Sequence, residues 1–345
     1  MRTLGAINDP VYREPAHGVF DRFFISFLKD KRDLPFIYLI IRISLVHIPL
    51  AMSLFFLPGI YWWMAAILYT VLVLLAAGPF TLMLHNTSHR LLFKRAYKRA
   101  NRLVPWLLCP FMGQSPDTYF SHHIGMHHAE NNMQDDLSST MRFQRDSFID
   151  FIRYFGRFIS IGILELVRYF HWKNKRKLMR QAMIGELTFL IVIGLLLYVN
   201  WAATLLVFVI PLFIVRFAMM AGNWAQHAFI DPNSPDNHYR NSITCINSTY
   251  NKKCFNDGYH IGHHLRPHMH WTDMPNDFLK NAQEYARQKA VVFEGIDYNQ
   301  IWFYLVTKNY SRLADHFVNI NHSYGTKDDI IELLRTRTRK IATSP

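Results

Sequence analysis

Four long apolar runs dominate the pattern of hydrophobic and polar positions along this chain of 345 residues. The clearest run, residues 60–84, contains 25 uncharged residues. At roughly 1.5 Å per residue it is long enough to cross a bilayer core of about 30 Å. The runs 36–57, 183–200 and 201–221 have similar character, although the first and last contain one arginine each. We therefore predict four transmembrane helices, in preference to the buried core helices of a large soluble protein.

The connections between these runs predict the topology. Pro58-Gly59 joins the first two runs and a break near Asn200-Trp201 joins the last two, and neither connection contains Lys or Arg. Nearly all of the 38 basic residues then fall on the other side, which the positive-inside rule places in the cytoplasm together with both termini. We predict an all-α integral membrane protein with two transmembrane hairpins and a cytoplasmic helical domain. The expected divisions are a cytoplasmic N-terminal segment (1–33), a membrane domain (34–275) and a C-terminal helical tail (276–345).

The formal net charge of +13 changes this picture little. Nucleic acid binding would suit such a charge, but basic clusters beside membrane helices are expected to meet anionic lipid headgroups, so we predict no nucleic acid partner. The three cysteines, Cys109, Cys245 and Cys254, show no Cys-x-x-Cys spacing and would face the reducing compartment. They therefore predict neither a disulfide framework nor an iron–sulfur site.

The segments between and after the membrane runs carry weaker patterns. Residues 103–113 are apolar but too short to span a bilayer, so we expect a re-entrant or interfacial piece. Residues 148–172 predict an amphipathic helix that lies on the membrane surface or packs on the cytoplasmic domain. Residues 231–253 are rich in Asn, Ser, Pro and Asp and should be mostly loop. The tail has a helical period over 278–292 and 298–306.

Candidate chemistry comes from four stretches that carry histidines, three of them with two or more histidines at helical spacing. Residues three and four apart share one face of a helix, so each of these three offers two or three imidazoles in one direction. Counted together, the four stretches give nine histidines as candidate metal ligands, whereas a single tetrahedral zinc takes four. We therefore predict two metal ions in one cavity, with iron favoured because imidazole suits iron. The stretches are His85-Asn-Thr-Ser-His89, His123-Ile-Gly-Met-His127-His128, Asn223-Trp-Ala-Gln-His227 and His260-Ile-Gly-His263-His264.

This set resembles the histidine boxes of the membrane fatty acid desaturase and hydroxylase superfamily, whose pattern is His-x3–4-His, His-x2–3-His-His and a later His-x2–3-His-His. His85 and His89 match the first box, and the resemblance extends over residues 36–275. It implies a four-crossing fold with a cytoplasmic di-iron site, in agreement with the topology above. The second box is matched by His123, His127 and His128, and the third by His260, His263 and His264. Asn223 and His227 are similar to an additional Asn-x-x-x-His element of acyl desaturases, in which the His is a ligand and the Asn holds a metal through water.

Some histidines leave the assignment open. His122 stands beside His123 and could replace it in a slipped register. His268 and His270 follow Pro267 and are expected to leave the ligand helix. Ligand imidazoles usually donate their second N–H to a carboxylate or a carbonyl. The carboxylates nearest in sequence are Asp135, Asp136 and Asp257. The lone histidines are expected to have no metal role: His17, His47, His171, His316 and His322.

Imidazole ligation of two irons predicts O2-dependent abstraction of hydrogen from an unactivated C–H bond, with a fatty acid or fatty acyl chain as substrate. We expect desaturation; hydroxylation and oxidative decarboxylation of a free fatty acid to a terminal alkene are the alternatives. Arg266, Lys252 and Lys253 could hold a free carboxylate or face lipid phosphate. Two other classes fit less well: a zinc hydrolase or metal-sensing receptor, and a structural membrane protein with incidental histidines.

Electrons for this chemistry must come from a separate carrier, because the chain has no Gly-rich nucleotide fingerprint and no rubredoxin-like cysteine set. The resemblance implies a ferredoxin, a rubredoxin or a cytochrome b5 system. The expected location is the inner membrane in a bacterium or the endoplasmic reticulum in a eukaryote.

Overall fold

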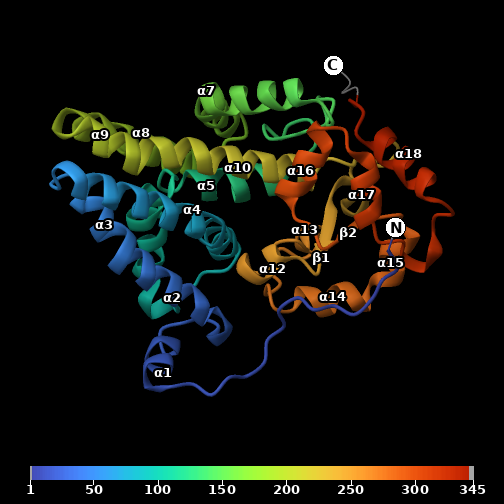
Figure 1. Ribbon diagram of the computed structural model, residues 1–345, viewed down its shortest axis with the longest axis horizontal. Helices are drawn as coiled ribbons and strands as arrows, with labels where there is room; N and C mark the ends of the chain where they lie inside the picture. The colour runs from blue at the N-terminus through green and yellow to red at the C-terminus, as the bar shows by residue number, and fades with distance from the viewer. Residues whose placement is uncertain (1, 342–345) are drawn as a thin grey trace. The chain divides into compact units, whose positions relative to one another are not determined.

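A computed structural model describes residues 2–341, and the described chain is mostly helical (Figure 1). The chain divides into two compact units. Unit 1 comprises Met1–Tyr12, Met126–Gly162 and Ala218–Pro345, and unit 2 comprises Arg13–Gly125 and Ile163–Phe217. Because each unit gathers segments that lie far apart in sequence, neither corresponds to one continuous stretch of the chain. The predicted divisions at residues 33 and 275 stay a prediction.

Among the described residues, four helical runs are long and apolar enough to cross a membrane: Lys31–Ser53, Gly59–His89, Arg176–Val199 and Trp201–Gln226. They coincide with the four predicted runs, although the first begins five residues earlier and ends at Ser53 rather than at residue 57. The second and third are single helices, α4 (Gly59–His89) and α8 (Arg176–Val199). The first and fourth runs each combine several segments, where η marks a 3-10 or a π segment. The first consists of η1 (Lys31–Asp33), α2 (Leu34–Arg42), η2 (Ile43–His47) and α3 (Ile48–Ser53). The fourth consists of α9 (Trp201–Thr204), η7 (Leu205–Val209) and α10 (Ile210–Gln226).

Wide π turns in these runs accompany prolines. The π segment η2 is followed by Pro49, and η7 is followed by Pro211. Proline has no N–H to donate to the carbonyl four residues earlier, and its ring crowds that carbonyl, so the turn before it opens. The same occurs in the predicted interfacial piece, where η4 (Val104–Leu108) precedes Pro110 and continues as η5 (Cys109–Met112).

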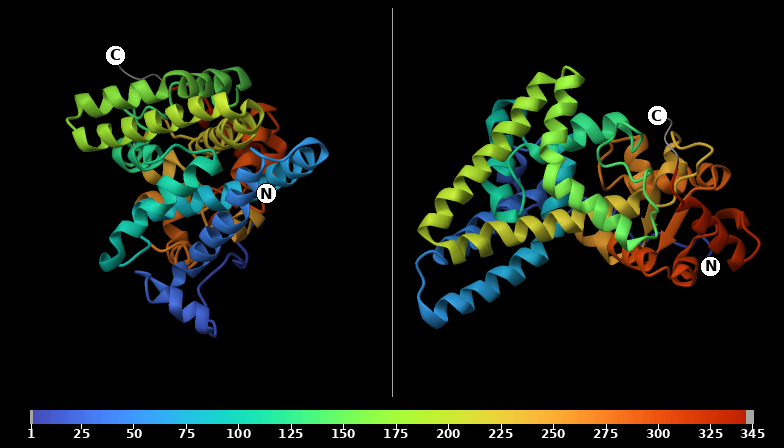
Figure 2. Two further views of the ribbon diagram at one scale, coloured as in Figure 1. Left: turned by 90° about the vertical axis from the view of Figure 1, so that its left-hand side faces the viewer. Right: turned by 90° about the horizontal axis from the view of Figure 1, so that it is seen from above.

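The core of unit 2 lies between these membrane runs. Tyr69 of α4 is fully buried, and its hydroxyl donates to the carbonyl oxygens of Phe111 and Val207. The helices α8 and α9 meet at Asn200 and lie side by side near this junction (Figure 2). The buried apolar members of this core are Ala51, Leu54, Ala65, Ala66, Tyr69, Val73, Phe189, Ile193, Ala203, Val207, Phe208 and Leu212.

One ion pair lies within the apolar surroundings of unit 2. Glu186 of α8 accepts from the Arg216 guanidinium at 3.1 Å and from the Ser115 hydroxyl. A charge at membrane depth is costly unless it is paired, so this contact fixes the segment around Ser115 to α8. Next to it, Gly185 lies against the Pro116 carbonyl. The chain continues from this anchored segment into α5 (Thr118–His122) and the π segment η6 (His123–His127).

Unit 1 contains two short strands, which corrects the all-α prediction. The strands β1 (Ile243–Ile246) and β2 (Val291–Glu294) pair in parallel, with Ile243 opposite Val291. Residues 231–253 were predicted as mostly loop because their composition is polar, but β1 is a fully buried run of four residues within them, three of which are apolar. Residues 278–292 were predicted as one helix. They form the end of α14 (Met274–Lys280), then α15 (Ala282–Arg287) and the start of β2.

The other predicted helices of this region are confirmed. The helix α7 spans Phe148–Trp172, and in its first half Phe151 and Tyr154 pack against Trp224, so this half packs on unit 1. The helix α16 spans Tyr298–Val306. The remaining elements are α1 (Val19–Ile25), η3 (Arg95–Arg102), α6 (His128–Glu130), α11 (His238–Asn241), α12 (Thr249–Lys253), α13 (His260–Leu265), α17 (Tyr310–His316), η8 (Ile320–His322) and α18 (Lys327–Arg337).

Substitution of Gly185 tests the close packing of unit 2. A methyl group at this position would overlap the Pro116 carbonyl oxygen, whereas one at Gly194 of the same helix would meet nothing within 4 Å. Overpacking typically costs about 1–3 kcal/mol, so Gly185→Ala should lower the thermal midpoint in detergent by several degrees. Gly194→Ala is the matched control, and it should keep or raise the midpoint because alanine favours helix. Equal midpoints for the two variants would contradict the packing.

Candidate metal centre

Four imidazoles of unit 1 converge to form what we name the tetrad: His127, His227, His260 and His264. One ring nitrogen of each lies within 4.8 Å of the others, and all four residues are buried. The Nε2 atom of His260 lies 3.2 Å from Nε2 of His227 and 3.0 Å from Nε2 of His264. The tetrad therefore brings together three stretches that are far apart in the sequence.

Local helix geometry explains how these rings meet. His260 and His264 are one turn apart on α13, as their spacing predicted. His227 follows directly on α10, and His127 ends the π segment η6. The chain entering α13 is restrained by a hydrogen bond, since Gly258 donates its N–H to Asn251 Oδ1 at 2.9 Å just before this helix.

Hydrogen bonds to the second ring nitrogen orient two tetrad imidazoles. His127 Nδ1 lies 2.7 Å from Asp136 Oδ2, and His227 Nδ1 lies 2.9 Å from the carbonyl oxygen of Asn241. These acceptors fix the Nδ1–H tautomer and leave the Nε2 lone pairs directed at the tetrad. Of the three carboxylates considered from the sequence, Asp136 makes this contact. Asp257 instead accepts from the Tyr250 hydroxyl at 2.8 Å, and Asp135 is exposed.

Burial keeps His227 and His264 uncharged at neutral pH. It lowers the pKa of His227 to about 4, with the neighbouring His127 adding to the effect. The pKa of His264 also lies well below its usual value, first because of burial and then because of the surrounding histidines. Neutral imidazole is the form that binds metal ions, because its lone pair is free.

The spacing of the nitrogen atoms fits a transition-metal ion. With metal–nitrogen bonds of about 2.1 Å, ligand nitrogens lie roughly 3.0 Å apart at right angles and roughly 3.4 Å apart in a tetrahedron. The observed separations of 3.0 and 3.2 Å are in this range. Imidazole donors suit iron, zinc, copper and nickel rather than magnesium or calcium. The donor set therefore fits a divalent transition metal and excludes a hard cation.

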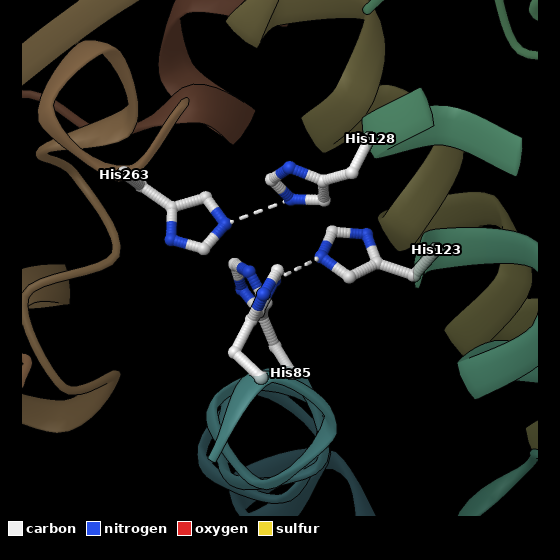
Figure 3. Close-up of side chains that lie close together, drawn as sticks. His85, His123, His128 and His263 are labelled. Atoms are coloured by element: carbon white, nitrogen blue, oxygen red, sulfur yellow. Dashed lines mark hydrogen bonds between the residues drawn. The ribbon is translucent and has the colours of Figure 1, made fainter. Parts of the chain in front are cut away.

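A second cluster in unit 1 is the pair His128 and His263, whose Nε2 atoms lie 3.0 Å apart (Figure 3). Adjacent histidines divide between the two clusters, since His127 belongs to the tetrad and His128 to the pair. His264 and His263 divide in the same way. The rings of His128 and His264 stack with centroids 4.9 Å apart. This division accounts for the two His-His doublets of the sequence, and it places two nitrogen clusters next to each other.

Unit 2 contains a third group, the triad His85, His89 and His123. His89 Nε2 lies 2.9 Å from His123 Nε2, and the rings of His85 and His123 point toward one another with centroids 4.5 Å apart (Figure 3). His85 and His89 lie one turn apart at the end of the 31-residue helix α4. It is His123 that the structure places against these two rings. Its assignment as a ligand in preference to His122 stays a prediction.

The remaining residues considered from the sequence have other surroundings. Asn223 uses its amide nitrogen to donate to the Ser138 carbonyl at 3.0 Å and to the Tyr154 hydroxyl at 2.7 Å, and its role as a ligand through water stays a prediction. His270 is buried with Nδ1 at 2.8 Å from the Thr272 hydroxyl, and His268 is exposed.

Sequence reasoning missed two residues near the tetrad. Asn241 is the acceptor for His227, and His238 has its ring centroid 5.9 Å from that of His264. Both belong to the short helix α11, inside a polar stretch predicted as loop, and no second histidine at helical spacing marks it. Only the three-dimensional structure shows that Asn241 and His238 lie close to the tetrad.

A comparison with protein family models gives one match, to the family described as fatty acid desaturase, over residues 60–295. This range is more than half of the 345 residues. The chain belongs to the fatty acid desaturase family. The comparisons with curated proteins and with solved structures gave no match. Family membership, the histidine clusters and the four apolar helices together indicate a metal-binding, multi-pass membrane oxidoreductase of fatty acid metabolism.

Substitution of Asp136 tests how this desaturase-family protein orients its metal-site imidazoles. Asp136→Asn removes the charge that accepts from His127 Nδ1, and loss of such a partner typically lowers metal affinity about 10–100-fold. Competition with a chelator of known affinity measures the effect. Asp135→Asn removes the same charge from the exposed neighbouring position and should leave affinity near that of the wild type. Equal affinities for the two variants would show that the His127–Asp136 contact does not support the site.

Proposed function

We propose that this protein is a membrane-bound di-iron enzyme that uses O2 to introduce a double bond into a fatty acyl chain. The observation that carries the proposal is the tetrad beside the His128–His263 pair, because two adjacent clusters made only of imidazoles suit two redox-active metal ions. Membership of the fatty acid desaturase family supports the same chemistry and the acyl substrate.

The proposed ligands divide between the two ions. The tetrad would hold one ion. The pair His128 and His263 offers two ligands, fewer than a stable site needs, so we propose that the triad completes the second ion. Support comes from chain continuity, since His123 and His128 lie five residues apart in the consecutive segments η6 and α6. Asn223 would hold one of the two ions through water, as the family resemblance implies.

Bound iron would supply the transfer of electrons to O2 that cleavage of an unactivated C–H bond requires. The residues of the chain would orient the imidazole ligands and exclude water. Asp136 and the Asn241 carbonyl hold the imidazoles of His127 and His227 in one tautomer. Buried aromatic rings around Trp224 pack beside this region and keep bulk water out of it. Zinc fits less well as the resident ion, because nine converging imidazoles exceed the four that one zinc takes.

We further propose that the four apolar helices form two hairpins with the metal centre on the cytoplasmic side. His85 and His89 end α4 and His227 follows α10, so these ligands lie at the ends of candidate membrane spans. The distribution of basic residues supports the cytoplasmic side. An acyl chain could then reach the metals from the bilayer. A separate ferredoxin, rubredoxin or cytochrome b5 would deliver electrons.

Hydroxylation and oxidative decarboxylation remain the alternatives within the same chemistry. Decarboxylation of a free acid would need a cation for the carboxylate. Arg266 was one candidate from the sequence, but it forms an ion pair with Asp277, and Lys252 and Lys253 are exposed. The ion pair with Asp277 makes Arg266 a less suitable partner for a free carboxylate.

Product analysis tests the reaction. The purified protein in lipid nanodiscs, supplied with a reducing system and fatty acids of defined length as free acid and as thioester, should consume O2 and yield an alkene of unchanged chain length. Mass spectrometry separates the outcomes. A product one carbon shorter indicates decarboxylation, an added oxygen indicates hydroxylation, and activity without O2 in a protein that holds only zinc would overturn the di-iron proposal.

Substitution of single ligands tests the division between the two ions. His264→Ala removes a tetrad ligand and His128→Ala removes a ligand of the pair, so each variant should lose O2 consumption and bind less iron per chain, measured by elemental analysis. His268→Ala changes an exposed histidine close to the same helix and is the control. Wild-type iron content in both ligand variants would contradict the assignment.

A further inference from the structure

The N-terminal segment, residues 2–12, belongs to unit 1 although its partners lie more than 200 residues away in sequence. The N–H of Arg2 donates to the Phe317 carbonyl at 2.8 Å, and the N–H of Asn319 donates to the Arg2 carbonyl at 2.8 Å. Asn247 donates through its amide to the Ala6 carbonyl at 2.9 Å and accepts from the Asn8 N–H at 2.7 Å. The N-terminal segment is therefore bonded along its length to the unit that carries the tetrad.

Asp9 is the buried acidic residue of this segment, with 5% of its surface exposed. Its Oδ2 atom accepts from the Tyr259 hydroxyl at 2.6 Å and from the Asn247 N–H at 2.7 Å. Hydrogen bonds to a carboxylate are short and roughly twice as strong as bonds between neutral groups. Burial and the adjacent Asp9 charge raise the pKa of Tyr259, so its hydroxyl remains a donor at every physiological pH.

Tyr259 is the residue before His260 and is the N-cap of α13. Its carbonyl oxygen accepts from the His263 N–H at 2.9 Å, which closes the first turn of this helix. The ring of Tyr259 is buried against Phe278, with centroids 5.8 Å apart. Because α13 has only six residues, it has little stability of its own, and tertiary contacts must fix its direction.

We infer that Asp9 is a positioning residue of the metal centre, which holds Tyr259 and thereby directs His260, His263 and His264 at their metal ions. The inference rests on the proposed metal binding by these histidines. It assigns residues 2–12 to the support of the metal site, a role that the sequence did not predict. The link runs through two hydrogen bonds, from the carboxylate to the hydroxyl and from the Tyr259 carbonyl into α13.

A set of four variants of the full-length protein tests this link. Asp9→Ala removes both bonds at Oδ2, whereas Asp9→Asn keeps an oxygen that can accept them. Tyr259→Phe removes only the hydroxyl and leaves the ring against Phe278. Asn8→Ala changes the exposed side chain next to Asp9 and is the matched control.

Two readouts separate positioning from general stability. The first is the visible spectrum after loading with Co2+ alone, which reports the geometry of the ligand field. The second is the rate at which a chelator removes the metal. Asp9→Ala and Tyr259→Phe should shift the Co2+ bands and lose metal at least about 10-fold faster, as expected for loss of a group that orients ligands. Asp9→Asn should be close to the wild type, and Asn8→Ala should match it.

The outcomes distinguish this inference from the proposed function. A wild-type protein that binds no Co2+ and no iron would overturn both. Normal binding by the wild type with unchanged spectra and release rates in Asp9→Ala and Tyr259→Phe would overturn the positioning role alone. If Asp9→Ala does not fold, Tyr259→Phe decides, because it removes one hydroxyl group and keeps the packing. A shift in Asp9→Ala without one in Tyr259→Phe would show that Asp9 does not act through Tyr259.

Discussion

Four imidazoles share a buried space in unit 1, and the rest of this unit depends on how they are held there. One ring nitrogen of each lies within 4.8 Å of the others, and all four residues are buried. Polar groups buried this closely are costly unless they have partners. A metal ion would satisfy all four lone pairs at once. The second nitrogens of two rings donate to the Asp136 carboxylate and to the Asn241 carbonyl.

The elements that carry these rings are short or end at the site, so contacts from distant parts of the chain must fix them. Arg145 is fully buried, and its guanidinium donates to the carbonyl oxygens of Ala228, next to His227, and of Arg337 near the end of the described chain. Burial lowers the pKa of Arg145 to about 9, so it remains charged at neutral pH. Asp9 supplies a comparable contact for α13 from the other end of the chain.

Sequence reasoning was most successful where the signal is periodic. Membrane runs such as 60–84 and the helix over 148–172 show their length and composition directly, and His260 and His264 were placed on one helix face by spacing alone. The family match covers residues 60–295, the range that contains all four histidine stretches. These features depend on residues that are neighbours along the chain.

The features that sequence reasoning missed depend on partners far apart in the sequence. The strand β1 forms because residues 243–246 are buried and pair with residues 291–294, and its polar flanks hid this. The choice of Asp136 over Asp135 follows from which side chain faces His127 after the chain turns. The Asp9–Tyr259 contact joins residues 250 positions apart, and no local pattern predicts it.

X-ray absorption at the iron edge of the purified protein tests the central claim most directly, because it reports the atoms bound to the metal. The account predicts about two irons per chain, bound by imidazole nitrogens at about 2.1 Å, with a second iron visible in the outer shell. A protein that binds no iron after reconstitution, or a first shell with sulfur, would contradict it.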